Sequence, residues 1–145
     1  MNTTESCIAA CNKLLRGELS AVETYEQALE KFSSSPESRI LEQIMDDHED
    51  SALILRDHLS DMGGTPDSDS GAWGSFAKAV EGTAKLFGES AALQALREGE
   101  EHGISEYEEA LNDNEVMEEI KGAIRGTLLP RLLAHLEALD GLRPA

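Results

Sequence analysis

Residues 17–29 read GELSAVETYEQAL, and residues 99–111 read GEEHGISEYEEAL. Six of the thirteen positions are identical in the two stretches, and they include the only two tyrosines of the chain. A segment that recurs once in each half of a chain indicates two related structural units. The shared positions are Gly17, Glu18, Tyr25, Glu26, Ala28 and Leu29, which recur as Gly99, Glu100, Tyr107, Glu108, Ala110 and Leu111.

Apolar residues around both repeats recur at alternating spacings of three and four residues, which is typical of the buried face of a bundle helix. Between these stretches, Ser35 is expected to cap a helix that starts at Pro36, and Gly63 is expected to end that helix. Asn112 is expected to cap the last helix, in which Pro130 should produce a kink. We therefore predict helices over residues 5–32, 36–62, 73–87, 90–111 and 115–139.

Short links join the helices within each half, whereas a long polar segment that begins at residue 63 separates the halves. An up-and-down bundle needs only short loops, while a ferritin-like bundle contains a long crossover connection. The predicted fold is therefore all-α. We expect a single domain over residues 1–145, a ferritin-like four-helix bundle with a long crossover that contains a short extra helix.

The chain is strongly acidic, because 29 aspartates and glutamates outnumber 12 lysines and arginines, for a formal net charge of −17. This charge excludes nucleic acids as partners and opposes binding to an anionic membrane. The chain has neither the run of roughly 20 apolar residues that spans a membrane nor the basic start of a secretory signal. Cys7 and Cys11 lie four residues apart and are poorly placed for a disulfide, so we expect a reduced, cytoplasmic protein.

Two glutamates of the repeat, Glu18 and Glu100, occupy positions on the apolar helix faces. A buried carboxylate costs several kcal/mol unless it is paired or binds a metal ion. Tyr25 and Tyr107 follow two helical turns later on the same faces. Because a phenol donates hydrogen bonds to carboxylates, we expect both tyrosines to orient the glutamates rather than to bind the ion themselves.

Each partner helix contributes one histidine to the same interior, His48 and His135. In di-iron ferritin-like bundles, two helices each supply a glutamate and the other two each supply a Glu-x-x-His motif. Here Met45 and Leu132 stand three residues before the histidines, so both bridging carboxylates are missing. We therefore predict a site for one ion, iron, manganese or zinc, with the ligands Glu18, His48 and Glu100 and with His135 as a further candidate ligand.

Counting residues from the links, at about 1.5 Å per residue, gives the depth of each group along the bundle. Glu18 and His48 fall within about 6 Å of one level, whereas His135 falls about 9 Å from the level of Glu100. The count predicts that Glu18, His48 and Glu100 meet and that His135 lies apart. The acidic neighbours of His48 are expected to point elsewhere: Asp46, Asp47, Glu49 and Asp50.

The same residues are also compatible with a centre that holds no metal. Two buried glutamates, one or two protonated histidines and two tyrosines nearly balance in charge, and they can satisfy one another through hydrogen bonds. In this alternative the chain is a non-enzymatic bundle that self-associates or binds a protein partner. Nothing in the pattern selects a substrate or a reaction.

Four stretches resemble a small bacterial branch of the ferritin-like superfamily, a family of unknown function. They are GELSAVETYEQAL, GGTPDSDSGAWGSFAKAVEGTAKLFG, ALREGEEHGISEYEEAL and LLPRLLAHLEALDGL, and the resemblance extends from about Leu14 to Leu142. It implies a bacterial four-helix bundle without an established activity. Better-known relatives, the rubrerythrins and bacterioferritins, use di-iron sites for peroxide reduction or ferrous oxidation. The residues that match such ligand positions here are Glu18, His48, Glu100 and His135.

We also expect a homo-oligomer. The acidic outer helix faces repel one another at low salt. Association should therefore use an apolar edge, for which Trp73 and Phe76 in the crossover are the candidates.

Overall fold

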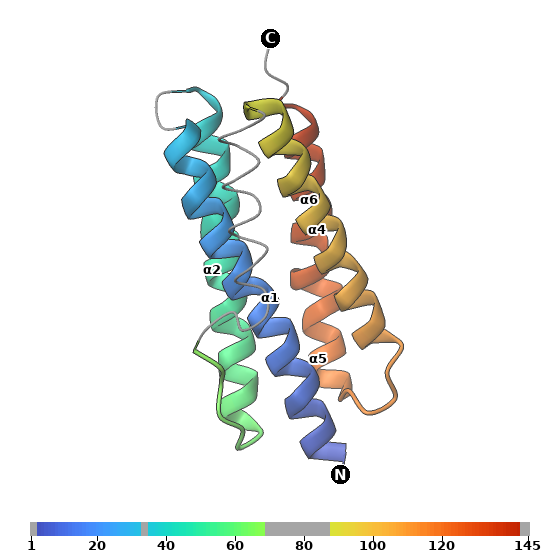
Figure 1. The fold of residues 1–145 in the computed structure, drawn as a ribbon. Helices are drawn as coiled ribbons and strands as arrows, with labels where there is room; N and C mark the ends of the chain where they lie inside the picture. The colour runs from blue at the N-terminus through green and yellow to red at the C-terminus, as the bar shows by residue number, and fades with distance from the viewer. Residues whose placement is uncertain (1–2, 33–34, 69–87, 143–145) are drawn as a thin grey trace.

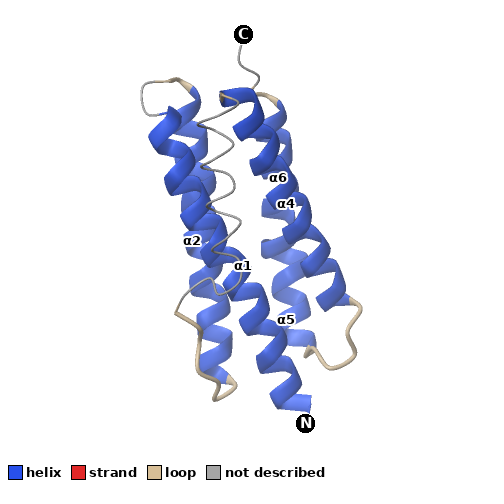
Figure 2. Cartoon of the chain, in the orientation of Figure 1, coloured by secondary structure: helices blue, strands red, loops and turns tan. Residues whose placement is uncertain are grey.

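A computed structural model describes residues 3–32, 35–68 and 88–142. Within these ranges the chain is helical and contains no strand (Figure 2), which confirms the prediction of an all-α helical bundle. The predicted helix over residues 73–87, with Trp73 and Phe76, lies outside the described residues. The elements are α1 (Thr3–Phe32), α2 (Glu37–Asp61), α4 (Glu89–Leu111), α5 (Glu118–Ala123), the π-helical η2 (Ile124–Leu128) and α6 (Leu129–Asp140).

Four long helices run along one axis, because α5, η2 and α6 follow one another without a break (Figure 1). α1 and α6 run in one direction, whereas α2 and α4 run in the other, so the start of α1 and the end of α6 lie at opposite ends of the bundle. α1 packs mainly against α2, and α4 mainly against α6 and α1. Since α2 and α4 are parallel, the end of α2 and the start of α4 lie at opposite ends of the bundle.

The end of α2 follows the prediction, whereas two predicted helix starts are wrong. Gly63 has φ +78°, and its N–H and that of Gly64 donate to the last carbonyls of α2. Pro36, not Ser35, precedes the first residue of α2, because the Ser35 hydroxyl donates to the Phe32 carbonyl at the end of α1. Asn112 ends α4 and does not cap the last helix, since its amide donates back to the Glu108 carbonyl.

The fourth helix contains a π-helical turn at the place where the sequence predicts a kink. Leu129 N–H donates to the Ile124 carbonyl, one residue further back than in an α-helix. Pro130 follows directly, and proline both lacks an N–H and clashes with the carbonyl four residues earlier. The wider turn accommodates the proline, and it also rotates the rest of α6 relative to a regular helix.

Two apolar clusters fill the interior, one toward each end of the bundle. The first contains Cys7, Leu15, Leu55 and Ile124 among others, and the second contains Phe32, Leu41 and Leu96 among others. Glu18, His48, Glu100 and His135 belong to neither cluster, although they are all at most 4% exposed. The bundle therefore has a polar layer between two apolar ones.

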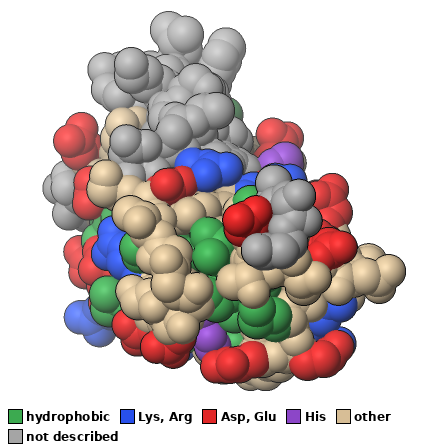
Figure 3. Space-filling view, turned by 90° about the horizontal axis from the view of Figure 1, so that it is seen from below, with side chains coloured by type: hydrophobic (Ala, Val, Ile, Leu, Met, Phe, Trp, Pro, Cys, Tyr) green, Lys and Arg blue, Asp and Glu red, His purple; other side chains and the backbone are tan. Residues whose placement is uncertain are grey.

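The outer surface carries most of the charge. Seen from the end that holds the N-terminus of α1, acidic side chains gather around the rim, and apolar side chains are visible toward the middle (Figure 3). None of the helices in the described residues is both long enough and apolar enough to cross a membrane.

Candidate metal centre

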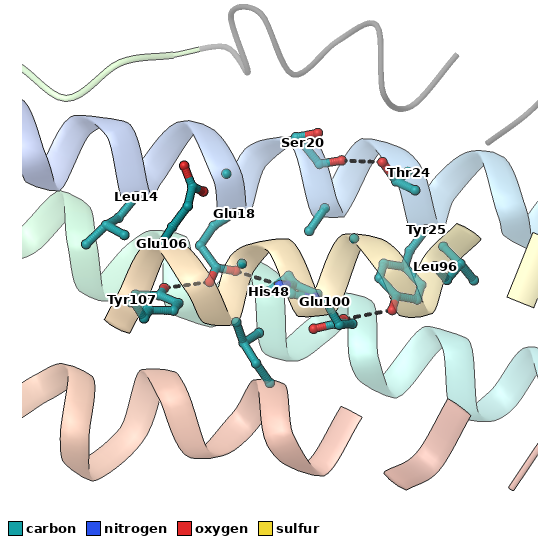
Figure 4. Close-up of a pocket in the computed structure, with 15 residues that line it drawn as sticks. Leu14, Glu18, Ser20, Thr24, Tyr25, His48, Leu96, Glu100, Glu106 and Tyr107 are labelled. Atoms are coloured by element: carbon teal, nitrogen blue, oxygen red, sulfur yellow. Dashed lines mark hydrogen bonds and ion pairs between the residues drawn. The ribbon is translucent and has the colours of Figure 1, made fainter. Parts of the chain in front are cut away.

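The two repeat glutamates lie in the polar layer, Glu18 on α1 and Glu100 on α4 (Figure 4). Each accepts a hydrogen bond from the tyrosine of the other repeat. Tyr25 Oη donates to Glu100 Oε1 at 2.8 Å, and Tyr107 Oη donates to Glu18 Oε1 at 2.6 Å. The pairs cross between the helices because α1 and α4 are antiparallel, so the end of one repeat lies beside the start of the other.

His48 on α2 lies between the two glutamates. Its Nδ1 is 2.6 Å from Glu18 Oε2, and its Nε2 is 2.8 Å from Glu100 Oε1. The imidazole also stacks on the Tyr25 ring, with ring centroids 5.5 Å apart. These contacts join the helix pairs across the interior, as the depth count predicts for Glu18, His48 and Glu100.

His135 on α6 reaches the same centre, as expected of a candidate ligand, although the depth count places it off the level of Glu100. Its Nδ1 is 3.2 Å from the Glu100 carboxylate, and its ring centroid is 4.9 Å from that of His48. The depth count started the last helix at about residue 115, whereas α5 begins at Glu118. The count also takes the last helix as regular, whereas it contains the π-helical turn Ile124–Leu128.

Asp47 also takes part, and the prediction that it points elsewhere is wrong. Asp47 Oδ2 lies 2.8 Å from His135 Nε2. One turn further along α2, Asp50 forms an ion pair with Arg131 at 2.9 Å. Asp47 faces the neighbouring helix α6 rather than the bundle axis. The periodicity of α2 alone identifies residues that face the axis, and it does not identify residues that face a neighbouring helix. Two acidic residues one turn apart on α2, Asp47 and Asp50, and two basic residues one turn apart on α6, Arg131 and His135, are the signal that indicates this contact.

The surroundings determine which groups carry protons. Burial alone would lower the pKa of His48, but the charges of Glu100 and Glu18 outweigh burial and raise this pKa to about 10. Burial would raise the pKa of Glu100, but His48 and His135 outweigh it and lower this pKa to about 2. In the metal-free protein His48 is therefore an imidazolium that donates from one nitrogen to the Glu18 carboxylate and from the other to Glu100.

The tyrosines remain neutral donors. Burial, reinforced by the charge of Glu100, raises the pKa of Tyr25 well above its ordinary value, and burial with Glu18 does the same for Tyr107. Each phenol therefore keeps its proton and donates it to a carboxylate, as the sequence predicts for residues that orient the glutamates.

Three buried residues from three helices offer ligand atoms that lie within 4.8 Å of one another: His48, Glu100 and His135. In the part of the chain that the structure describes, this group can hold a metal ion. Glu18, the fourth predicted ligand, is not a member, because its carboxylate occupies the other side of the His48 ring. Each histidine thus turns one nitrogen toward Glu100 and the other toward a second carboxylate, Glu18 or Asp47.

The cysteines lie outside this centre. Cys7 and Cys11 are free thiols, fully buried in the apolar cluster near the N-terminus. Burial, followed by the proximity of Cys7, raises the pKa of Cys11 to about 12. A thiol with so high a pKa is neither a nucleophile nor a ready metal ligand at neutral pH.

A cavity of about 40 Å³ lies beside the centre, between α1 and α4. Of the three clustered residues, His48 and Glu100 line it, whereas His135 does not. Glu18, Tyr25 and Tyr107 also line it (Figure 4).

The family described as "Domain of unknown function (DUF2383)" matches residues 6–113, which are 108 of the 145 residues. The chain belongs to this family. No curated protein and no solved structure matches the chain. The family match includes Glu18, Tyr25, His48, Glu100 and Tyr107, and it ends before His135.

Proposed function

We propose that this protein is a single-domain, ferritin-like bundle that binds one transition metal ion in its polar layer, for redox or metal-handling work. The observation that carries the proposal is the buried group of His48, Glu100 and His135, whose ligand atoms converge within 4.8 Å. These residues come from α2, α4 and α6, so only the folded bundle brings them together. Iron, manganese and zinc are the candidate ions.

The donor set fits such an ion. Two histidines and one carboxylate are a ligand set used by non-haem iron and by zinc enzymes, and imidazole with carboxylate also suits manganese. A metal-binding histidine usually donates its other N–H to a carboxylate, which fixes the orientation of the ring. Glu18 stands in this position for His48, and Asp47 for His135. When bound, iron or manganese would supply one-electron redox chemistry, and zinc would supply Lewis acidity.

The helix arrangement supports the ferritin-like part of the proposal. α2 and α4 are parallel, so the two helix pairs need a long connection, as in ferritin-like folds. Met45 and Leu132 occupy the positions at which a di-iron site has its bridging glutamates. With only three clustered donors, the site suits one ion better than two.

A second candidate is a metal-free polar centre in a non-enzymatic bundle that self-associates or binds a protein. The observation that favours it is His48, which contacts both glutamates directly, at 2.6 and 2.8 Å. With its pKa raised to about 10, His48 balances one of the two buried negative charges without any ion. A metal would have to displace this proton, so metal affinity should fall as the pH is lowered.

Elemental analysis of protein purified without an affinity tag or chelator tests the two candidates. We expect about one equivalent of iron, manganese or zinc per chain, and an anomalous scattering peak between the imidazoles of His48 and His135. Titration of the stripped protein should show the same stoichiometry, and binding should raise the melting temperature.

Matched variants make the test specific to the site. Glu100→Gln should abolish uptake, whereas Glu101→Gln should leave it unchanged, because Glu101 lies on the surface and contacts Arg97. His135→Gln should weaken uptake, whereas His58→Gln, outside the centre, should not. If wild type and Glu100→Gln contain equally little metal after growth in each ion, the metal-free centre is the correct reading.

A further inference from the structure

The cavity beside the centre exists because α1 and α4 carry small residues where they face it. α1 contributes Gly17, Ser20 and Ala21, and α4 contributes Gly99 and Gly103. All five lie in the two repeat stretches, and Gly17 and Gly99 occupy the same repeat position, directly before Glu18 and Glu100. The space is therefore formed by the same sequence feature that places Glu18 and Glu100.

The wall of the cavity is closely packed. A Cβ atom at Gly17 would lie 3.0 Å from Glu106 Oε1, and one at Gly103 would lie 3.0 Å from a methyl group of Leu132. Contacts this short leave little room for the wall to move inward. The cavity is small, about 40 Å³, which suits a molecule of only a few heavy atoms.

The polar groups around the cavity already have partners. Both oxygens of Glu18 have a donor, Tyr107 and His48, and the Glu100 carboxylate has three, Tyr25, His48 and His135. The Thr24 hydroxyl donates to the Ser20 carbonyl at 2.8 Å. A buried water needs two to four polar partners, which these groups no longer offer freely.

The charges around the cavity disfavour an anion in the metal-free protein. The carboxyl groups of Glu18, Glu100 and Glu106 line it, and His48 supplies one balancing positive charge. The remainder of the wall includes the apolar side chains of Leu14, Leu96 and Leu132. A small neutral molecule is the class of ligand that fits both the size and the character of this space.

We propose that this cavity binds a neutral molecule of two or three heavy atoms, such as a dissolved diatomic gas, next to His48 and Glu100. Binding in the cavity needs no metal. The further statement that the molecule lies beside an ion rests on the proposed metal-binding function, and the two are tested separately.

Crystals of the metal-stripped protein under xenon pressure test the cavity itself. We expect xenon between α1 and α4, bounded by Ala21, His48 and Glu100, and we expect no azide there when crystals are soaked in this anion of similar length. A row of ordered waters that xenon does not displace, or azide in the cavity, would overturn the proposal.

Two valine variants on the same helix provide the control. Ala21→Val adds two methyl groups inside the cavity and should remove the xenon peak. Ala9→Val makes the same change at an exposed position of α1 and should leave the peak unchanged. If Ala21→Val does not fold, the wild-type crystals alone decide, since xenon occupancy and ordered water are alternative outcomes.

Nitric oxide tests the position next to an ion. We expect its addition to the Fe²⁺-loaded protein to change the visible spectrum, and we expect this change to be lost in Ala21→Val while iron stoichiometry stays the same. An unchanged spectrum with iron bound and xenon in the cavity refutes only the placement beside the ion. A protein that binds xenon but no metal refutes the proposed function and leaves the cavity proposal standing.

Discussion

The two helix pairs carry the same glutamate and tyrosine, yet their histidines differ. Tyr25 and Tyr107 form equivalent bonds, each to the glutamate of the other repeat. His48, from the α1–α2 pair, contacts both glutamates, whereas His135, from the α4–α6 pair, contacts one glutamate and a half-exposed aspartate, Asp47.

This difference makes Glu100 the central residue of the polar layer. Glu100 is contacted by two histidines and one tyrosine, whereas Glu18 is contacted by one of each. A pair of equivalent halves would place a metal midway between two glutamates. The observed contacts place the three converging donors on the Glu100 side, with Glu18 behind His48.

Removal of each histidine in turn should give the largest difference between the halves. In metal-stripped protein, His48→Ala leaves two buried carboxylates without their shared cation and should lower the free energy of unfolding by about 3–5 kcal/mol. His135→Ala should cost about 1–3 kcal/mol, because Glu100 keeps His48 and Tyr25 while Asp47 is partly solvated.

Urea denaturation of both variants measures the difference. His58→Ala, on the same helix as His48 but outside the polar layer, shows the cost of losing an imidazole elsewhere. Equal losses for His48→Ala and His135→Ala would show that the two histidines are equivalent after all.

The pH dependence of stability should isolate His48. Its folded-state pKa of about 10 lies above the ordinary value of 6.5, so its contribution is complete below pH 6.5 and is lost as the pH rises through 10. Glu100, with a pKa of about 2, belongs to the same ion pair, and its contribution is lost only as the pH falls from 4.5 through 2. We expect the urea midpoint of stripped protein to fall between pH 6.5 and 10, and to fall less in His48→Gln. Parallel curves for both proteins would contradict the assignment.

Much of the polar layer could be predicted because the repeat is local in sequence. A glutamate on an apolar face, with a tyrosine two turns later, predicts two buried side chains in either half. The helix periodicity alone brings both residues inward. The burial of Glu18, Tyr25, His48, Glu100 and Tyr107 follows from that periodicity.

The contacts of His135 and Asp47 depend on features that the sequence of a single helix does not reveal. His135 reaches the centre from a helix that contains a π-helical turn before Pro130, which a count of regular helical residues does not include. Asp47 reaches His135 because α2 and α6 are neighbours, which is a property of the packed bundle. The prediction of the crossed tyrosine pairs would have required the antiparallel direction of α1 and α4.

The tyrosines should show a smaller difference in the same direction. Tyr107→Phe should destabilise the stripped protein by about 2–3 kcal/mol and Tyr25→Phe by about 1–2 kcal/mol, because a hydrogen bond to a buried charge is lost in each. The loss is greater for Tyr107 since Glu18 retains only His48, whereas Glu100 retains two histidines. Thermal and urea unfolding of the two variants measures the order, and the reverse order would show that Glu100 is not the central residue.

Asp47→Ala should have the smallest effect on stability and still distinguish the two candidate functions. The Asp47 side chain is 47% exposed, so its interaction with His135 is screened by solvent and should contribute less than about 1 kcal/mol. As the partner of the outer nitrogen of a metal-binding histidine, however, Asp47 should affect metal affinity about tenfold or more. Asp46→Ala, at the exposed neighbouring position, is the matched control and should change neither quantity.

Titration calorimetry with Zn²⁺ or Mn²⁺ measures the metal affinity, and urea denaturation measures the stability. A loss of affinity in Asp47→Ala alone, at unchanged stability, would show that His135 binds the ion. Equal affinity in both variants would leave His135 as a hydrogen-bonding residue and reduce the centre to His48 and Glu100.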